Sequence, residues 1–320
     1  MKEFFKKLSM RKRRNNETLT KKQKNLQSIL GLMLAVFAAL LFRSFLFEPF
    51  RIPSESMMPN LLIGDFLFVK KSEYGYTRFS FPLGSKTSWE GRLKPNNLKR
   101  GDMVVFRPLN NSVDHSDNYV KRVIAISGDT VDISGDMITV NQKLLHQEKK
   151  SDYYFIKIGR ELDGFEMKNK YLNETIKVIK GKLFIDGKKI SNNNFNITYL
   201  SRSQCDKLQS LFCLTVFKLD KIIETNDNVS YEILQLVDQD KSQYRLNFVV
   251  PENEFFVMGD NRNFSLDGRV FGTIPENRLV GKVVVLFFSH NYYRPIWKVW
   301  NWGTAIRWDR IFRLTDKIYD

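Results

Sequence analysis

The sequence predicts a mainly β fold, with an antiparallel β-sheet core that follows one transmembrane helix. Two observations carry this prediction. One apolar stretch near the start of the 320-residue chain is long enough to cross a bilayer, and short apolar or alternating runs separated by turn residues follow it. Runs of this kind are typical of β-strands. Since no helical repeat competes with them, we expect sheet after the apolar stretch.

The apolar stretch runs from Ile29 to Phe47, with Arg43 near its end. As a helix it would be about 28 Å long, close to the roughly 30 Å of a hydrocarbon core. Arg43 lies where its side chain can reach the lipid headgroups. A buried core helix is the alternative, but the strongly basic flank argues against it. We therefore expect a transmembrane anchor helix over residues 25–47.

The basic flank also predicts orientation. Residues 1–24 hold ten Lys or Arg against two Glu, which is a net charge of +8 and half of the +16 of the whole chain. Short basic segments stay on the cytoplasmic side of a membrane. Residues 1–24 are thus a predicted cytoplasmic tail, and everything after Phe47 is expected on the outer side of the membrane. A cleaved signal peptide is the rival interpretation, but no small-residue cleavage pattern follows the stretch.

After the anchor, the composition divides the chain into three parts. Residues 48–135 and 251–320 hold most of the expected strands, including 67–69, 103–106, 119–126, 130–133 and 283–288. Residues 136–250 are richer in Lys, Asn and Asp, which indicates an inserted, variable lobe. We expect the two flanking parts to form one core.

The two cysteines and the basic composition bear on three further features: a disulfide, a zinc site and nucleic acid binding. Cys205 and Cys213 could close one disulfide in an oxidising compartment or remain thiols, and both alternatives stay open. Two cysteines with scattered histidines do not predict a zinc site. The chain shows neither zinc-finger spacing nor an aromatic RNA-binding motif, so nucleic acid is not an expected partner.

The C-terminal tail interleaves aromatic residues with Lys and Arg. Trp and Tyr favour the bilayer interface, and basic residues favour lipid phosphates. Contact with membrane lipid and ordinary packing of the segment are equally good interpretations of this pattern. The aromatic and basic residues are Trp297, Lys298, Trp300, Trp302, Arg307, Trp308, Arg310, Phe312 and Arg313.

The candidate nucleophile is Ser56, a few residues past the apolar stretch in Pro-Ser-Glu-Ser-Met-Met-Pro. A serine attacks only when a neighbouring base takes its proton. Histidine is the usual base. The three histidines of this chain, His115, His146 and His290, lie in no recognisable motif. A lysine that burial keeps neutral is the alternative base.

Lys121 fits this alternative, because it lies in the apolar run Tyr-Val-Lys-Arg-Val-Ile-Ala-Ile. Side chains alternate along a strand, so Lys121 and Arg122 are expected to point opposite ways, and one can face the core while the other faces solvent. A second loop, 259–269, places two Asp and two Arg close to Ser265. Each segment alone could be an ordinary strand edge or turn.

Taken in order, these segments resemble bacterial type I signal peptidase, the leader peptidase family of membrane-anchored Ser/Lys proteases. The resemblance rests on Ser54 to Pro59, Gly64-Asp65, Arg100-Gly101-Asp102, Tyr119 to Arg122 and the 259–269 loop, and it is weak over 136–250. It implies a signal-peptidase type of antiparallel catalytic core with an inserted second lobe.

The resemblance also implies roles for individual residues. Ser56 matches the nucleophile, Lys121 the general base, and Ser54 with the Ser56 backbone N–H the oxyanion hole. Ser265 matches a serine that orients the lysine. Asp260, Arg262, Asp267 and Arg269 match structural ion pairs, and Phe50, Ile52, Leu61, Tyr119 and Val120 match positions that line the substrate pockets. Asn263, Phe264 and Gly268 depart from the family pattern, which puts details of that loop in doubt.

The function that follows is removal of N-terminal signal peptides from secretory preproteins through an acyl-enzyme, without a metal or a cofactor. A self-cleaving Ser/Lys regulator similar to LexA is one alternative, and it predicts an N-terminal DNA-binding helix pair where this chain has an apolar helix. An anchored non-catalytic periplasmic assembly protein is another, and it predicts loss of Ser56 or Lys121.

Overall fold

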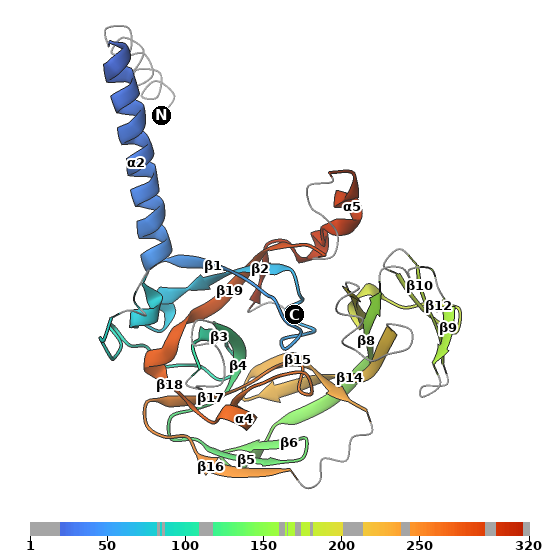
Figure 1. The fold of residues 1–320 in the computed structure, drawn as a ribbon. Helices are drawn as coiled ribbons and strands as arrows, with labels where there is room; N and C mark the ends of the chain where they lie inside the picture. Colours follow the sequence, from blue (N-terminus) through green and yellow to red (C-terminus); the bar gives the residue numbers. More distant parts are fainter. Residues whose placement is uncertain are drawn as a thin grey trace. The chain divides into compact units, whose positions relative to one another are not determined.

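The computed structural model describes residues 20–81, 84, 87–108, 118–159, 164, 166–169, 174–179, 182–200, 214–237, 244–291 and 299–315. The chain divides into two compact units, Met1–Phe47 and Glu48–Asp320. We call the second the sheet unit. Figure 1 shows the elements of both in chain order.

The first unit contains the helix α2, Lys21–Phe45. Its start is capped reciprocally, because Thr20 Oγ1 accepts from the Gln23 backbone N–H while the Gln23 side chain accepts from the Thr20 backbone N–H. The segment Gln23–Phe45 is long and apolar enough to cross a membrane by length and composition. Its large apolar side chains do not pack into a core within this unit. The helix ends at Phe45, two residues before the first strand begins.

The main sheet of the sheet unit carries the strands that bear the candidate site. Among the described residues it has the order β1-β2-β19-β3-β4-β17-β18, with β20 paired to β19. Adjacent strands along β2 to β18 run antiparallel, as predicted. The bounds are β1 Phe47–Arg51, β2 Asp65–Lys70, β3 Met103–Phe106, β4 Tyr119–Ile126, β17 Glu254–Met258, β18 Ile274–Pro275, β19 Leu279–Ser289 and β20 Arg313–Leu314.

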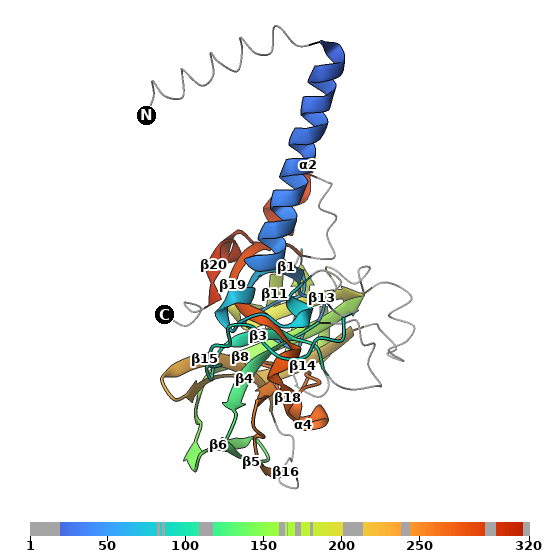
Figure 2. The same ribbon diagram turned by 90° about the vertical axis from the view of Figure 1, so that its left-hand side faces the viewer.

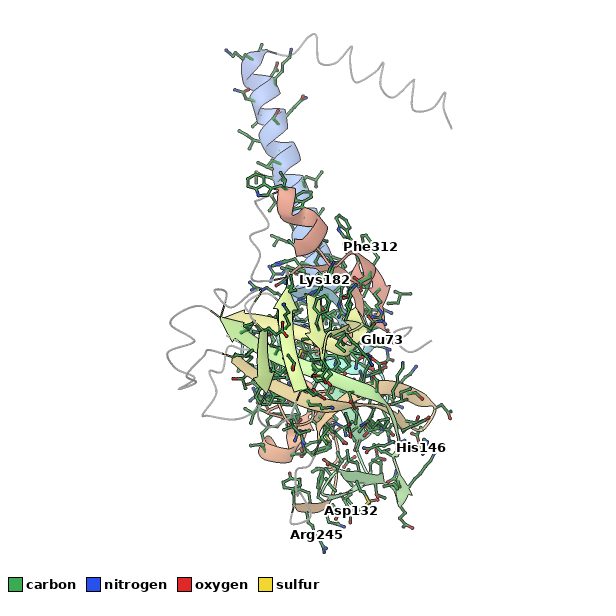
Figure 3. The ribbon with its side chains drawn as sticks, turned by 90° about the vertical axis from the view of Figure 1, so that its right-hand side faces the viewer. Glu73, Asp132, His146, Lys182, Arg245 and Phe312 are labelled. Carbon is green, nitrogen blue, oxygen red and sulfur yellow. The ribbon has the colours of Figure 1, made fainter. Side chains whose placement is uncertain are left out.

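A second, four-stranded sheet has the order β16-β5-β6-β7. In Figure 3 the side chains of Asp132 and Arg245 mark it at one end of the sheet unit, with Phe312 at the other end. Its apolar face packs on residues of β4, β15 and β17 in one core cluster that includes Ile124, Ile133, Tyr231 and Phe256. The bounds are β5 Thr130–Ser134, β6 Met137–Val140, β7 Lys143–Leu144 and β16 Arg245–Val249.

Two further four-stranded sheets come from the middle of the chain, with orders β13-β8-β14-β15 and β12-β11-β10-β9. The pair β13 and β8 is parallel, whereas β8 and β14 form a long antiparallel ribbon. Figure 2 shows this ribbon passing behind β4. The bounds are β8 His146–Gly159, β9 Glu166–Asn169, β10 Glu174–Ile179, β11 Lys182–Ile185, β12 Lys188–Lys189, β13 Phe195–Leu200, β14 Leu214–Asn226 and β15 Val229–Leu236; the short helices are α4 Gly268–Phe271 and α5 Trp302–Ala305.

The mainly β, antiparallel fold class is therefore confirmed. The predicted inserted lobe, residues 136–250, contributes β6 and β16 to the sheet of β5, and Tyr231 and Ile233 to the same core cluster as Ile124. Its boundaries stay a prediction. Cys205 and Cys213 lie outside the described residues, so their pairing stays a prediction as well.

The C-terminal tail combines the two patterns expected for it. Trp300 and Phe312 are 77% and 75% exposed. In contrast, Arg310 is buried and donates to both carboxylate oxygens of the fully buried Asp65, and Arg307 donates to the carbonyl oxygen of Ile63. The two arginines therefore hold the segment on the loop between β1 and β2, and several of its aromatic side chains face outward.

Candidate active site

Ser56 and Lys121 meet in the structure, although 65 residues separate them in the chain. Lys121 lies in β4, and Ser56 lies in the turn between β1 and β2. A hydrogen bond of 2.7 Å joins Lys121 Nζ to Ser56 Oγ. Both side chains are buried, since Lys121 is 4% exposed and Ser56 is 8% exposed. The predicted nucleophile and the predicted base are thus in direct contact.

Burial lowers the pKa of Lys121 to about 8 from its usual value of 10.5, because the apolar surroundings penalise the ammonium form. The carboxylates of Asp267 and Asp260 oppose this shift, and the guanidinium of Arg269 supports it. An amine with a pKa near 8 is partly neutral near neutral pH. It then has a lone pair that can accept the proton of a serine hydroxyl.

Ser54 lies on the exposed side of the nucleophile. Its Oγ is 3.4 Å from Ser56 Oγ, and its side chain is open to solvent. A hydroxyl in this position can reach the carbonyl oxygen of a peptide that approaches Ser56. The arrangement suits an oxyanion hole made by the Ser54 hydroxyl and the Ser56 backbone N–H, and this role stays a prediction.

The backbone of the nucleophile turn is held by Asn261, a residue that sequence reasoning did not single out. Its backbone N–H donates to the Ser56 carbonyl at 3.1 Å, and its side-chain amide donates to the Glu55 carbonyl at 3.2 Å. Asn261 is fully buried, and it lies in the loop that follows β17. The loop after β17 therefore holds the backbone of the nucleophile turn at two carbonyl groups.

A second unpredicted contact reaches the same turn from β8. Lys157 Nζ donates to Glu55 Oε1 at 2.9 Å, and the two side chains are 24% and 26% exposed. The ammonium of Lys157 also lies 5.1 Å from the ring centre of Phe155 and 6.0 Å from that of Phe264. Glu55, which lies between Ser54 and Ser56, is thus held by an ion pair to β8.

Ser265 lies against Gly259, close to the nucleophile. A Cβ on Gly259 would be 2.2 Å from Ser265 Oγ and 2.6 Å from the Ser56 carbonyl oxygen, so only glycine permits this approach. The Ser265 hydroxyl is buried and close enough to Asp267 to help lower the pKa of that carboxyl, yet it makes no hydrogen bond of good geometry in this conformation. The structure places Ser265 at the site but does not join it to Lys121, and its orienting role stays a prediction.

The four residues predicted to form ion pairs do not pair only among themselves. Asp267 and Arg269 pair directly at 2.8 Å. Asp260 instead binds Arg122, and Arg262 binds Glu224 at 2.8 Å. Sequence reasoning missed both of these partners, which belong to β4 and β14. The Arg122 and Asp260 side chains are both almost completely buried.

The burial of Arg122 corrects the expectation that only one of Lys121 and Arg122 faces the interior. Both are buried, at 4% and 2% exposed, although neighbouring strand positions point to opposite faces. The second face of β4 is covered by Tyr231, whose ring centre is 4.1 Å from the Arg122 guanidinium carbon. A buried Arg requires a carboxylate partner. The position of Arg122 within an apolar run was therefore the one signal in the sequence that pointed to a buried acidic partner such as Asp260.

The predicted pocket residues divide into two groups. Ile52 and Leu61 are buried in a core cluster with Met57, and Phe50 and Val120 pack against that cluster. Tyr119 packs instead against a different cluster, beside Phe106 and Phe271. Leu61 is fully buried and is part of the core in this structure. Their role in binding substrate stays a prediction.

The structure describes two of the three histidines. His146 begins β8 and is paired with Thr225, and the His290 ring packs near Phe66. His115 lies outside the described residues. Within the described ranges, no three His, Cys, Asp or Glu side chains gather closely enough to hold a metal ion. Independence from a metal and from a cofactor stays a prediction.

Comparison with known proteins identifies the family of this chain. The family model described as "Signal peptidase, peptidase S26" matches residues 25–288. The signal peptidase I of Buchnera aphidicola subsp. Schizaphis graminum is 34% identical over 93% of this chain and 84% of its own. That of Rickettsia typhi is 28% identical over 93% of this chain and 97% of its own.

A crystal structure of a signal peptidase I from Enterococcus faecalis V583 covers 58% of this chain and 97% of its own, at 17% identity and a TM-score of 0.24. The family assignment does not depend on that likeness. It rests on the family model, which spans most of the chain and both halves of the site, and on the relatives above 30% identity. The chain belongs to the signal peptidase family, peptidase S26, and is a serine peptidase.

Proposed function

We propose that this chain is a membrane-anchored endopeptidase that removes N-terminal signal peptides from secretory preproteins, with Ser56 as nucleophile and Lys121 as general base. The observation that carries the proposal is the buried 2.7 Å contact between Lys121 Nζ and Ser56 Oγ. Family membership supports the substrate class, since the curated relatives are named signal peptidase I.

In the first half of the proposed reaction, neutral Lys121 takes the proton of Ser56 Oγ while Oγ bonds to the scissile carbonyl carbon. The negative charge that develops on the carbonyl oxygen is stabilised by the Ser54 hydroxyl and the Ser56 N–H, a class of donor worth about 3–4 kcal/mol. The C–N bond then breaks, and the leaving amine takes the proton from the Lys121 ammonium. The products are an acyl-enzyme and the mature protein.

In the second half, water replaces the amine. Lys121 takes a proton from that water as its oxygen attacks the acyl carbon, and the proton then passes to Ser56 Oγ when the ester bond breaks. The enzyme returns to its starting state, and the signal peptide leaves with a new carboxylate. No step of this cycle needs a redox partner or a metal.

The substrate is proposed to bind as an extended strand, with main-chain hydrogen bonds supplying affinity and small pockets supplying specificity. Phe50, Ile52, Leu61, Tyr119 and Val120 are proposed to shape pockets for Ala-like residues one and three positions before the cut. Ser265, with the pairs of Asp260, Arg262, Asp267 and Arg269, is proposed to hold the base in place.

The proposal includes the membrane and its lipid. The apolar helix α2 is a candidate anchor, and the basic residues before it favour a cytoplasmic N-terminus and a periplasmic sheet unit. The exposed aromatic side chains of the tail are proposed to contact lipid at the bilayer interface. The residues at positions 1–24 and 25–47 are accordingly the proposed cytoplasmic tail and anchor.

A cleavage assay with a preprotein in non-ionic detergent tests the proposal. We expect Ser56→Ala and Lys121→Met to abolish cleavage, and Lys143→Met, a loss of charge at an exposed lysine, to leave it unchanged. His146→Ala and His290→Ala should retain activity. Near-normal cleavage by Lys121→Met, together with loss in a histidine variant, would show that the dyad assignment is wrong.

A further inference from the structure

Three arginines surround one phenylalanine ring in the sheet unit. The guanidinium carbons of Arg78, Arg107 and Arg278 lie 4.8, 5.0 and 5.4 Å from the ring centre of Phe79. A guanidinium over an aromatic face is held by attraction to the ring, and its N–H edges remain available. Because a ring has two faces, at least two of the three groups share one face.

Backbone contacts from separate segments build this arrangement. The N–H of Arg107, directly after β3, donates to the carbonyl of Arg278, directly before β19, at 3.0 Å. The short turn that carries Arg78 and Phe79 is tied to β19 by Thr77, whose hydroxyl donates to the Leu279 carbonyl at 2.6 Å. The Phe79 ring packs against the core cluster that contains Met57. The cluster of charges is therefore part of the fold.

The three positive charges lack a carboxylate partner among the ion pairs of the described residues. Burial lowers the pKa of Arg278, and the like charges of Arg78 and Arg107 lower it further, while the exposed Glu90 opposes the shift. The three like charges therefore lie close enough to repel one another. A fold that holds like charges together in this way favours a bound anion.

Within the described residues, most of the N–H donors in the group have no hydrogen-bond partner. One nitrogen of Arg78 donates to the Thr87 carbonyl at 3.1 Å, and Nε of Arg107 donates to Asn118 Oδ1 at 3.2 Å. The structure shows no side-chain hydrogen bond for Arg278 within the described residues. A guanidinium has five N–H donors. The group can thus donate several charge-assisted hydrogen bonds to one ligand.

We propose that Arg78, Arg107 and Arg278 form a binding site for a phosphate-class anion, held open by the Phe79 ring. A planar carboxylate is satisfied by the fork of a single Arg, whereas a tetrahedral phosphate can accept from several guanidinium groups at once. Free inorganic phosphate and the phosphate of a phospholipid headgroup present the same chemistry. The proposal does not depend on the proposed function, because neither Ser56 nor Lys121 takes part in it.

Binding of inorganic phosphate to the full chain in non-ionic detergent, measured by calorimetry at constant ionic strength, tests the proposal. We expect saturable binding of one phosphate per chain, and a loss of at least about tenfold in affinity for the double variant Arg78→Gln/Arg278→Gln. The matched control is Arg245→Gln, which removes one exposed charge from β16, in a different sheet. It should bind phosphate as the wild type does.

Two further variants separate a built site from general attraction to positive charge. Arg278→Lys keeps the charge but loses the planar fork, and Phe79→Leu keeps all three charges but removes the ring. Both should weaken phosphate binding by several-fold while melting near the wild-type temperature. Absence of saturable binding by the wild type, or an equal loss in Arg245→Gln, would overturn the proposal.

A lipid probe in place of inorganic phosphate distinguishes a lipid headgroup from free phosphate as the ligand. Dihexanoyl phosphatidate presents a lipid phosphate in soluble form, and dihexanoyl phosphatidylcholine is its zwitterionic control. Tighter binding of phosphatidate than of inorganic phosphate, lost in Arg78→Gln/Arg278→Gln, supports a lipid headgroup as ligand. Equal binding of the two supports a site for phosphate from either source.

Discussion

Arg122 donates hydrogen bonds of 2.7 Å to each carboxylate oxygen of Asp260, in a pair that is almost completely shielded from water. Asp260 Oδ2 also accepts from the side chain of Asn60 at 2.7 Å. Arg122 follows Lys121 in β4, Asn60 lies four residues after Ser56, and Asp260 precedes Asn261. One carboxylate therefore connects the strand of the base, the turn of the nucleophile and the loop beneath them.

Removal of one partner from this pair should strongly destabilise the sheet unit. We expect Asp260→Asn or Arg122→Met to lower the free energy of unfolding by about 3–5 kcal/mol, because a buried charge is left without its partner. Lys177→Met, which breaks an exposed pair with Glu166, should cost less than about 1 kcal/mol. Urea unfolding of the three variants measures the difference. Similar small losses in all of them would contradict the prediction.

Cleavage should depend on the protonation of Lys121, whose pKa is about 8. Because the neutral amine is the active form, the rate should rise about tenfold per pH unit below this pKa and level off above it. The measurement is kcat/KM for a signal-peptide substrate over a pH series in detergent. A profile that is flat across the pKa would show that Lys121 does not act as the base.

Burial of the Lys121 ammonium should also lower the free energy of unfolding near neutral pH. Its folded pKa, about 8, lies below the unfolded value of 10.5, so the unfolded state binds more protons in that window and stability should rise as pH increases from about 8 to about 10.5. Below this window the penalty is fully present, at about 3 kcal/mol from roughly 1.4 kcal/mol per pKa unit. Lys121→Met, which abolishes activity, should therefore unfold at higher urea near neutral pH.

The advantage of Lys121→Met should be partly offset by loss of the hydrogen bond to Ser56, worth about 1 kcal/mol. It should shrink as pH rises above 8, since the wild-type amine is then neutral in the folded state. Urea midpoints of both proteins at a series of pH values give the comparison. An advantage that stays constant with pH would mean that desolvation of the ammonium is not its cause.

The contact between Glu55 and Lys157 should affect catalysis more than stability. We expect Glu55→Gln and Lys157→Met each to lower kcat by a few-fold, in keeping with roughly 0.2–1 kcal/mol for a partly exposed pair. The double variant should be no slower than the worse single variant, because both remove the same contact. Lys157→Arg should restore most of the rate. Losses that multiply in the double variant would show that the two residues act independently.

The sequence predicted the parts of the molecule that depend on local pattern. The apolar stretch, the alternating runs and the turns between them predicted α2 and the antiparallel strands. Ser56 and Lys121 were candidates by their chemistry, and the resemblance of several motifs in order to the signal peptidase family gave them their predicted roles. The motifs also placed Ser265 next to the site, although the predicted contact with Lys121 is absent from this conformation.

The partners that lie far away in sequence were not predicted. Glu224 lies in an otherwise alternating strand, where a buried carboxylate looks like a solvent-facing one until the fold places Arg262 beside it. Asn261 acts through its backbone N–H, which any residue supplies, and through its side-chain amide, which is an ordinary group in a polar turn. Glu55 and Lys157 are ordinary surface charges by sequence, and only the approach of β8 to the nucleophile turn joins them.

The spacing of the Arg122 and Asp260 pair has a consequence for the order of events during synthesis. The pair joins residues 138 positions apart, so Asp260 is made long after Arg122. Ser56 and Lys121 both leave the ribosome long before the loop that braces them. A partly synthesised chain thus contains the nucleophile and the base without their support, so proteolytic activity should appear only after the 259–269 loop has been made.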